Sequence, residues 1–302
     1  MKGLQGNVEF HQAAKGAGYL VATHYTDGAY KTMFLEKVDV YEVVKDGDSN
    51  LMPGRKLSEE EKTNLQASSD GKVHVADNGI FNDEAAAEKY ANQHGTGIGG
   101  PRYYAAFPEA GNGVSEGLVA VHQKVFENDF WGLTNATQET KLEMIQYGRS
   151  GLHLDGHSRG SMTIGNAMES LAKDGNQGLL GGTTVSFFGA AYNGEKADAL
   201  LSGLQNRDAV QDPSQRQAME LTLQIHMADP VGRYIGGNPS AGGTIPGGSN
   251  LLYEMWRALD GQENTTHNCY GAPGNRACQA LWSNSSNKET ATLPISAFEG
   301  WK

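Results

Sequence analysis

A serine between two glycines is the part of this sequence best suited to covalent chemistry. Ser158 stands in the pattern Gly-x-Ser-x-Gly, which runs from Gly156 to Gly160. Apolar residues alternate through 151–155 as in a half-buried strand, and 161–172 carries apolar residues at the spacing of one helix face. A serine on a sharp strand-to-helix turn exposes its hydroxyl. The flanks therefore predict a nucleophile, although the pattern alone would also suit a glycine-rich loop in a chain with 40 glycines.

A serine hydroxyl needs a base, usually a histidine, and a carboxylate that orients this histidine. Two histidines follow Ser158 in the chain, His226 and His267. His226 falls inside an expected strand at 221–227 and is predicted to pack in the sheet, whereas His267 lies in a polar loop. Asp229 follows that strand directly, and the proline after it cannot continue a central strand. Asp229 and His267 are therefore the favoured partners of the serine.

Other acidic residues follow the serine, but none comes directly after a clear strand. These rivals are Asp198, Asp208, Asp212, Glu254, Asp260 and Glu263. Asp229 has an alternative role in capping or closing a turn, and a histidine in a polar loop is often simply solvated. The pairing of Asp229 with His267 is therefore a hypothesis for the structure to examine.

The serine pattern, with His157 before the nucleophile, resembles the lipase and esterase branch of the α/β-hydrolase family, and this resemblance covers roughly residues 100–270. In that family the chain order is serine, acid, histidine. The resemblance therefore implies a catalytic triad of Ser158, Asp229 and His267. It implies an activity as well: a serine esterase or lipase with this triad.

The oxyanion of an acyl-transfer intermediate needs two backbone N–H donors. The resemblance assigns the first to Arg159, directly after the nucleophile. The second is expected in the loop after a strand at 103–107, where Pro108 has no N–H and Phe107 and Glu109 are the alternatives. This strand departs from many lipases because the His-Gly signature is missing from it.

Three further segments, 77–84, 226–239 and 266–271, look like C-terminal regions of bacterial filamentous-haemagglutinin-type exoproteins. This second resemblance implies a toxin module that is secreted or delivered into a target bacterium within a larger exoprotein, with a cognate immunity protein as partner. Together the two resemblances imply an enzyme that cleaves lipid or phospholipid acyl esters. The alternatives are a thioesterase or acyltransferase with the same triad, and a non-enzymatic adhesin or interaction domain on a hydrolase scaffold.

The composition argues against several other classes of protein. The net charge of −11 is the opposite of the basic surface that nucleic-acid binding requires. The same negative charge argues against binding to anionic membranes by charge alone. Transient contact with a membrane surface would therefore depend on an apolar rim around the site. We expect no transmembrane helix, because no run approaches ~18 apolar residues, and we expect no signal peptide at the start of this chain.

We expect neither a cofactor nor a metal. The glycines of 95–100 match a dinucleotide-binding pattern but follow an expected helix instead of a strand. Residues 46–50 resemble half a calcium loop, but Leu51 and Leu57 stand where glycine and a bidentate glutamate are required. The remaining candidate ligands are three alternating residues of one strand, His153, Asp155 and His157. In the hydrolase interpretation that strand enters the sheet, which disfavours a metal there.

The chain has two cysteines, Cys269 and Cys278, which are too sparse for a zinc site. A disulfide between them would close a short loop beside His267 and steady it, and it would form only in an oxidising compartment. Two free thiols are the alternative.

From residue 73 onward, expected strands and helices alternate, which favours a mainly parallel sheet covered on both faces. The expected strands lie at 73–75, 103–107, 152–155, 183–188 and 221–227. The expected helices lie at 82–93, 114–130, 138–147, 161–172, 196–204 and 250–259. We therefore predict an α/β fold resembling an α/β-hydrolase, in which a mostly parallel sheet is flanked by helices.

Two domains are predicted: a β-rich N-terminal portion, 1–75, and a hydrolase catalytic domain, 76–302. The N-terminal portion contains expected strands at 19–23 and 32–44, and Ser58 and Glu61 form a capping-box pattern. These strands could equally be an early pair of the catalytic domain's own sheet. A glycine-rich loop at 236–249 is a candidate lid over the substrate entrance.

Overall fold

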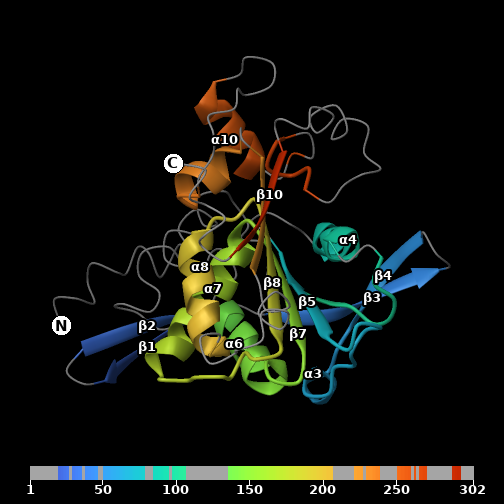
Figure 1. The fold of residues 1–302 in the computed structure, drawn as a ribbon, viewed down its shortest axis with the longest axis vertical. Coiled ribbons are helices and arrows are strands. Elements are labelled where there is room, and N and C mark those ends of the chain that lie inside the picture. Colours follow the sequence, from blue (N-terminus) through green and yellow to red (C-terminus); the bar gives the residue numbers. More distant parts are fainter. Residues whose placement is uncertain are drawn as a thin grey trace.

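The computed structural model describes residues 20–26, 29–35, 38–46, 50–78, 84–94, 97–106, 135–206, 221–226, 229–238, 250–259, 262, 265–270 and 288–293. Within this part of the chain an eight-stranded sheet has the strand order β10-β9-β8-β7-β5-β6-β3-β4. Figure 1 shows the sheet with helices on both of its faces. A separate two-stranded sheet pairs β1 (Leu20–Thr26) with β2 (Ala29–Leu35).

Five neighbouring strands in the middle of the large sheet are parallel, as the alternation of strands and helices predicted. They are β5 (Val73–Asp77), β6 (Tyr103–Ala106), β7 (Leu152–His157), β8 (Thr183–Phe188) and β9 (Leu221–His226). The order places β5 between β6 and β7, so the chain crosses from β5 outward to β6 and then back past β5 to β7. The predicted α/β class and mostly parallel sheet are confirmed. The boundaries of these five strands differ from the prediction by at most two residues.

Antiparallel strands extend both edges of the sheet. β3 (Asp39–Asp46) pairs with β6 and with β4 (Asn50–Lys56), and β10 (Lys288–Leu293) pairs with β9. The β3–β4 pair therefore belongs to the large sheet, which is the second of the two arrangements considered for the N-terminal strands. The predicted division at residue 75 falls inside β5, and the division into two domains stays a prediction.

Helices cover the two faces of the sheet unequally. α6 (Asn135–Tyr147), α7 (Arg159–Lys173) and α8 (Gly194–Gln205) lie on one face, and α4 (Glu84–His94) lies on the other (Figure 1). α10 (Leu251–Leu259) lies near the ends at which the parallel strands stop (Figure 1). The short helix α3 (Glu59–Lys62) begins with the predicted capping box, in which Ser58 and Glu61 exchange hydrogen bonds. The expected helix at 114–130 lies outside the described residues.

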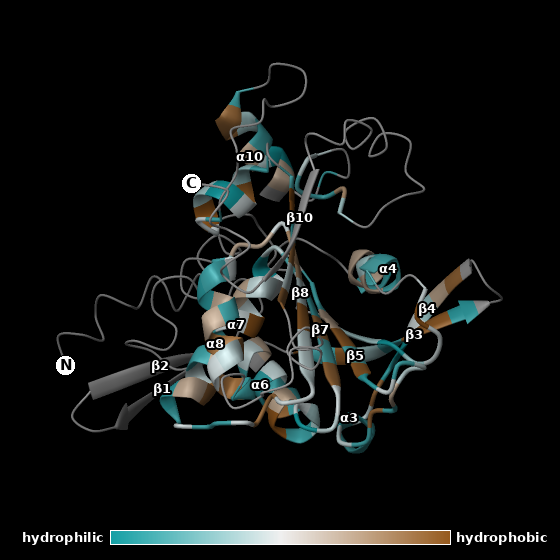
Figure 2. Ribbon diagram, in the orientation of Figure 1, coloured by the Kyte–Doolittle hydropathy of each residue, from teal (hydrophilic) through white to brown (hydrophobic). Residues whose placement is uncertain are grey.

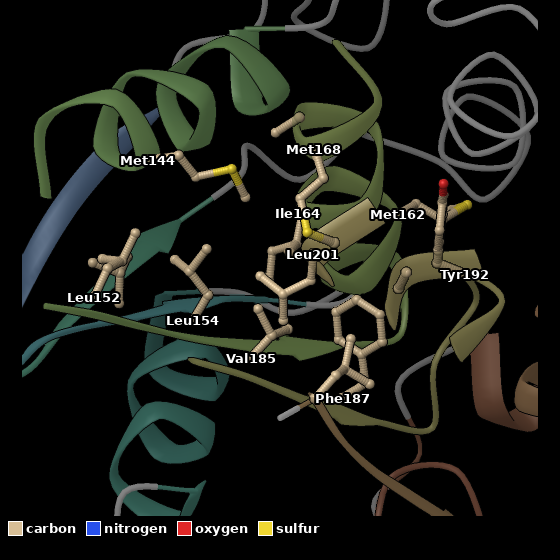
Figure 3. Close-up of a cluster of buried hydrophobic side chains, with 14 of the residues drawn as sticks. Met144, Leu152, Leu154, Met162, Ile164, Met168, Val185, Phe187, Tyr192 and Leu201 are labelled. Carbon is tan, nitrogen blue, oxygen red and sulfur yellow. The ribbon is translucent and has the colours of Figure 1, made fainter. Parts of the chain in front are cut away.

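The apolar core lies between the sheet and the helices α6, α7 and α8. Alternate residues of the strands enter this core, so β7 contributes Leu152 and Leu154, and β8 contributes Val185 and Phe187. Figure 3 shows these side chains against the methionine and isoleucine residues of α6 and α7. Figure 2 shows hydrophobic residues concentrated along the central strands, while α3 at the rim is hydrophilic. None of the described helices is long and apolar enough to cross a membrane.

Candidate active site

Ser158 occupies a sharp turn between β7 and α7, as the glycine pattern predicted. Its backbone has φ 54° and ψ −118°, a combination that a residue with a Cβ rarely adopts, and α7 begins at the next residue, Arg159. The Ser158 N–H donates to the carbonyl of Phe188 over 3.1 Å, and the Ser158 carbonyl accepts from the Ser161 hydroxyl over 2.6 Å. Such a conformation costs about 1–3 kcal/mol and persists only where the surroundings hold it.

The two glycines of the pattern are required by close packing around this turn. A Cβ on Gly160 would lie 2.1 Å from the carbonyl oxygen of Asp77 on the neighbouring strand β5. A Cβ on Gly156 would lie 2.9 Å from Cα of Ser161 and 2.9 Å from Cδ1 of Ile164. The glycines therefore let the start of α7 press against β5 and against the end of β7.

The structure brings Asp229 and His267 into direct contact. Nδ1 of His267 lies 3.1 Å from Oδ1 and 3.0 Å from Oδ2 of Asp229. Asp229 follows β9, as expected, and it also closes a turn, because its Oδ1 accepts from the N–H groups of Val231 and Gly232 over 2.8 and 3.1 Å. The two roles considered for Asp229, partner of a histidine and closer of a turn, are thus both present.

Asp229 is completely buried, and its carboxylate is surrounded by hydrogen-bond donors. The Tyr270 hydroxyl donates to Oδ2 over 2.7 Å, in addition to the bonds from His267 and the backbone. Burial by itself raises the pKa of Asp229, but the interactions with His267 and Tyr270 outweigh it, so the pKa lies below the ordinary value. Asp229 is therefore an ionised acceptor beneath the imidazole.

The serine turn and the loop of residues 265–270, which we call the base loop, touch through His157. Nε2 of His157 lies 3.0 Å from the carbonyl oxygen of His267, and the two imidazole rings are stacked with centroids 5.0 Å apart. His157 directly precedes Ser158, so this contact attaches the base loop to the end of β7, while no hydrogen bond between the Ser158 hydroxyl and Nε2 of His267 is present in the described part of the chain. Nε2 of His267 is buried and has no hydrogen-bond partner among the described residues.

The site is closed to solvent in this structure, since Ser158 is 3% exposed and His267 is 1% exposed. Both side chains are therefore almost out of contact with solvent in this arrangement. The candidate lid at 236–249 lies largely outside the described residues, whose last member in this segment is Asn238. The side-chain amide of Asn238 is buried and donates to the carbonyls of Ala190 and Tyr192 over 2.9 and 3.0 Å.

The second oxyanion donor expected from the sequence stays a prediction. The strand order places β5 beside β7, and the described residue that follows β5 is Asn78. Phe107 and Glu109, the donors considered from the sequence, lie outside the described residues. Asn78 is buried, and its carbonyl oxygen would lie 3.0 Å from a Cβ on Gly160. Arg159, the first expected donor, starts α7 and is also buried.

The competing candidates occupy other places. His226 is buried at the end of β9, and its backbone N–H donates to the Tyr270 hydroxyl over 2.7 Å. Glu254 pairs with Arg257 on α10 at 2.9 Å, and Asp198 is buried on α8. The other rival acids, Asp208, Asp212, Asp260 and Glu263, lie outside the described residues.

Two features around the base were not expected from the sequence. Tyr270 connects Asp229 with the backbone of β9, and the only signal for it was its position three residues after His267. A pair of buried carboxyl groups, Asp77 on β5 and Glu143 on α6, lies behind the serine turn. Burial raises the pKa of Asp77 to about 7, and burial followed by the nearby Asp77 raises the pKa of Glu143 well above its usual range.

Cys269 in the base loop is buried and disulfide-bonded, while Cys278 lies outside the described residues. No group of three or more histidine, cysteine, aspartate or glutamate side chains in the described part of the chain is placed to hold a metal ion. Comparisons of this chain with protein families, with curated proteins and with solved structures find no match.

Proposed function

We propose that this protein is a serine hydrolase of the α/β-hydrolase type, which cleaves carboxylic esters with Ser158 as nucleophile, His267 as base and Asp229 as its orienting acid. The observation that carries the proposal is the buried Asp229–His267 hydrogen bond next to a serine held at a positive φ between a strand and a helix. A strained serine that is held in place beside a histidine–carboxylate pair is difficult to explain as architecture alone.

The proposed reaction begins with attack of the Ser158 hydroxyl oxygen on the ester carbonyl carbon. Nε2 of His267 takes the hydroxyl proton as the new C–O bond forms, and Asp229 fixes the proton on Nδ1 and stabilises the imidazolium. The carbonyl reforms, the alcohol leaves with the proton from Nε2, and water then hydrolyses the acyl-enzyme by the same steps in reverse.

The negative charge on the attacked oxygen needs preorganised donors. The N–H of Arg159 at the start of α7 is the proposed first donor, where the helix dipole adds partial positive charge. The loop that begins at Asn78 is the proposed source of the second donor, because β5 is the neighbour of β7 in the sheet. This places the developing oxyanion between the start of α7 and the end of β5.

Lipid or phospholipid acyl esters are the proposed substrates, and α10 supports this choice. Its outer face exposes Leu252, Tyr253 and Trp256, and Leu252 is 75% exposed. The helix adjoins the base loop, because the Asn268 amide donates to the carbonyl of Ala258 over 3.1 Å. Aromatic and apolar residues on one helix face are suited to the boundary between water and a lipid layer.

The resemblance to haemagglutinin-type exoproteins supports a toxin role for this hydrolase. We propose that the chain is a secreted or delivered module, that it acts on the lipids of a target bacterium, and that a cognate immunity protein neutralises it in the producing cell. If so, expression of the wild-type chain in a susceptible bacterial host arrests growth, whereas expression of Ser158→Ala does not.

The decisive experiment is covalent labelling with a fluorophosphonate, followed by intact-mass measurement. We expect a single adduct on the wild-type chain and none on Ser158→Ala. Ser150→Ala is the matched control, since it removes one hydroxyl from an exposed turn before β7 and should label as the wild type does.

A folded wild-type chain that takes up no adduct after detergent opening of the site would contradict the hydrolase proposal and favour a binding module on the same scaffold. When the adduct forms, turnover of phospholipid vesicles, of soluble short-chain esters and of acyl thioesters separates a lipid esterase from a thioesterase.

A further inference from the structure

Three aromatic side chains from outside the base loop contact its backbone. They are Tyr90 and His94 of α4 and His157 of β7, which we call the ring clamp. The His157 N–H donates to the carbonyl of His267 over 3.0 Å, and the Tyr90 hydroxyl donates to the carbonyl of Asn268 over 3.1 Å. His94 is hydrogen-bonded to the backbone of Tyr270. The backbone of three residues of the base loop is thus hydrogen-bonded to aromatic side chains on the α4 side of the sheet.

The rings of the clamp also support one another. Tyr90 and His157 have ring centroids 4.6 Å apart, and His94 lies flat on Phe188 of β8 at 3.7 Å with an interplanar angle of 8°. Tyr90 and His157 are buried, and His157 in addition stacks on the imidazole of His267. This packing fixes the direction of each donor toward the base loop.

The chemistry of the contact defines the state of His157. A carbonyl oxygen only accepts hydrogen bonds, so His157 must carry its proton on Nε2. Its Nδ1 is then an acceptor, and it has no hydrogen-bond partner in the described part of the chain. Burial, and then the nearby imidazoles of His267 and His94, lower the pKa of His157 well below its usual range. A neutral ring therefore faces His267 and does not repel the imidazolium that forms during the proposed reaction.

We propose that His157 is a positioning residue for the base, and that Tyr90 and His94 hold it in this role. His157, which directly precedes the proposed nucleophile, is hydrogen-bonded to His267, the proposed base. We infer that this one side chain sets the distance between Ser158 and His267. The proposal rests on the assignment of His267 as the base. Asp229 orients the imidazole from the other side but does not connect it to the serine turn.

Two substitutions separate the donor of His157 from its ring. His157→Phe keeps a ring of similar shape and removes the donor, whereas His157→Gln keeps an N–H donor of comparable reach and removes the ring. We expect His157→Phe to lower the rate of fluorophosphonate labelling about 10- to 100-fold, as a base displaced by about 1 Å would. His157→Gln should recover a large part of that rate.

His153→Phe is the matched control, because His153 lies on the same strand and faces the same side but contacts Thr184 and Asp155 instead of the base loop. It should leave the labelling rate unchanged even where it lowers stability. Tyr90→Phe, which removes only the hydroxyl bonded to Asn268, should lower the rate less than His157→Phe does.

A second readout does not depend on catalysis. The proton on Nδ1 of His267, held by Asp229, gives a separate NMR signal when the imidazole is fixed. We expect this signal in the wild-type chain and in His157→Gln, and expect it broadened or lost in His157→Phe. An intact signal in His157→Phe, together with wild-type labelling, would overturn the positioning role and leave the hydrolase proposal standing. Loss of the signal in His157→Phe, with no labelling of the wild type, would show that His157 orients the imidazole of His267 but would refute both the hydrolase proposal and the role of His267 as a base.

Discussion

The two faces of the sheet use the same strands for different purposes. On β7, Leu152 and Leu154 enter the apolar core beneath α7. His153 and Asp155 alternate with them and face the side of α4. There Nε2 of His153 is hydrogen-bonded to Oδ1 of Asp155 at 3.0 Å. The ring of His74 on β5 lies against that of His153, with centroids 4.7 Å apart and planes tilted by 38°. On β7, the α7 face is therefore used for close apolar packing and the α4 face for hydrogen bonds that orient particular groups, although α4 also packs Ala87 and Ala91 in an apolar cluster with Ala76 and Tyr104.

The contrast between the two faces of β7 indicates which substitutions should affect activity and which should affect stability. An apolar core loses free energy in proportion to the buried volume that is removed. A hydrogen-bonded group that orients a base changes the rate of a reaction by its geometry, with little change in the amount of buried surface.

The largest effect is expected at Asp229, whose carboxylate holds the proton of His267 on Nδ1. Asp229→Asn keeps the shape of the side chain but allows the wrong tautomer of His267, and we expect kcat for ester hydrolysis to fall on the order of 10⁴-fold. Asn turns an NH2 group toward donors that now face a carboxylate oxygen, so we also expect a loss of about 1–3 kcal/mol in stability, and kcat is compared at a temperature where the variant is folded. Asp174→Asn, at the exposed end of α7, is the matched control and should keep full activity. Equal activity of both variants would remove Asp229 from the mechanism.

The next effect concerns the apolar face. Leu154 is fully buried in the core (Figure 3), and Leu154→Ala should lower the free energy of unfolding by about 2–5 kcal/mol through lost burial and a cavity. At a temperature where the variant is folded, its labelling rate should stay close to that of the wild type. Denaturant unfolding measures the first quantity. Ile145→Ala, at a position 48% exposed on α6, serves as the control and should cost less than about 1 kcal/mol. A large loss of labelling in folded Leu154→Ala would break the contrast between the faces.

The smallest predicted effect concerns Asp77, a buried carboxyl group on the otherwise apolar side of the sheet. Its neighbours on α6 are Thr140, Glu139 and Glu143. The nearby positive charge is Arg159 of α7. The Asp77 pKa of about 7 in the folded protein exceeds the ordinary value of 3.8. The folded state therefore holds a proton that the unfolded state releases, so wild-type stability falls as pH rises from about 4 to about 7 and stays low above that range.

Asp77→Asn removes this ionisation and keeps an oxygen that accepts from Thr140. We expect the variant to be more stable than the wild type at pH 8, on the order of 2 kcal/mol, and equal to it near pH 4. Denaturant unfolding at both pH values provides the measurement. A stability difference that does not change between pH 4 and pH 8 would show that Asp77 does not titrate in this way.

The sequence predicts local features of this molecule well and distant pairings poorly. The strands at 183–188 and 221–226 and the helix α7 follow from apolar spacing, and the turn at Ser158 follows from its glycines. The position of Asp229 after a strand also follows from local rules, because proline ends a central strand. Each of these features depends on residues that are neighbours in the chain.

What the sequence does not predict depends on which elements become neighbours in space. The helix expected at 82–93 includes Tyr90 and stops one residue before His94, and nothing in its periodicity indicates that either ring contacts the backbone of the base loop. Periodicity predicts strands at 73–75 and 103–107 without the order that places β5 beside β7, and that order depends on contacts between segments far apart in the chain. The charge pattern likewise gives no sign that Asp77 and Glu143 are buried together.

The position of the base loop along the chain has a consequence during protein synthesis. His157 and His267 are 110 residues apart, so β7 and α7 leave the ribosome long before the base loop does. On the proposed mechanism, a nascent chain that ends before residue 265 carries a serine without a base. Synthesis must therefore advance by 110 residues from His157 to His267, which separates the appearance of the serine turn from the appearance of its proposed base.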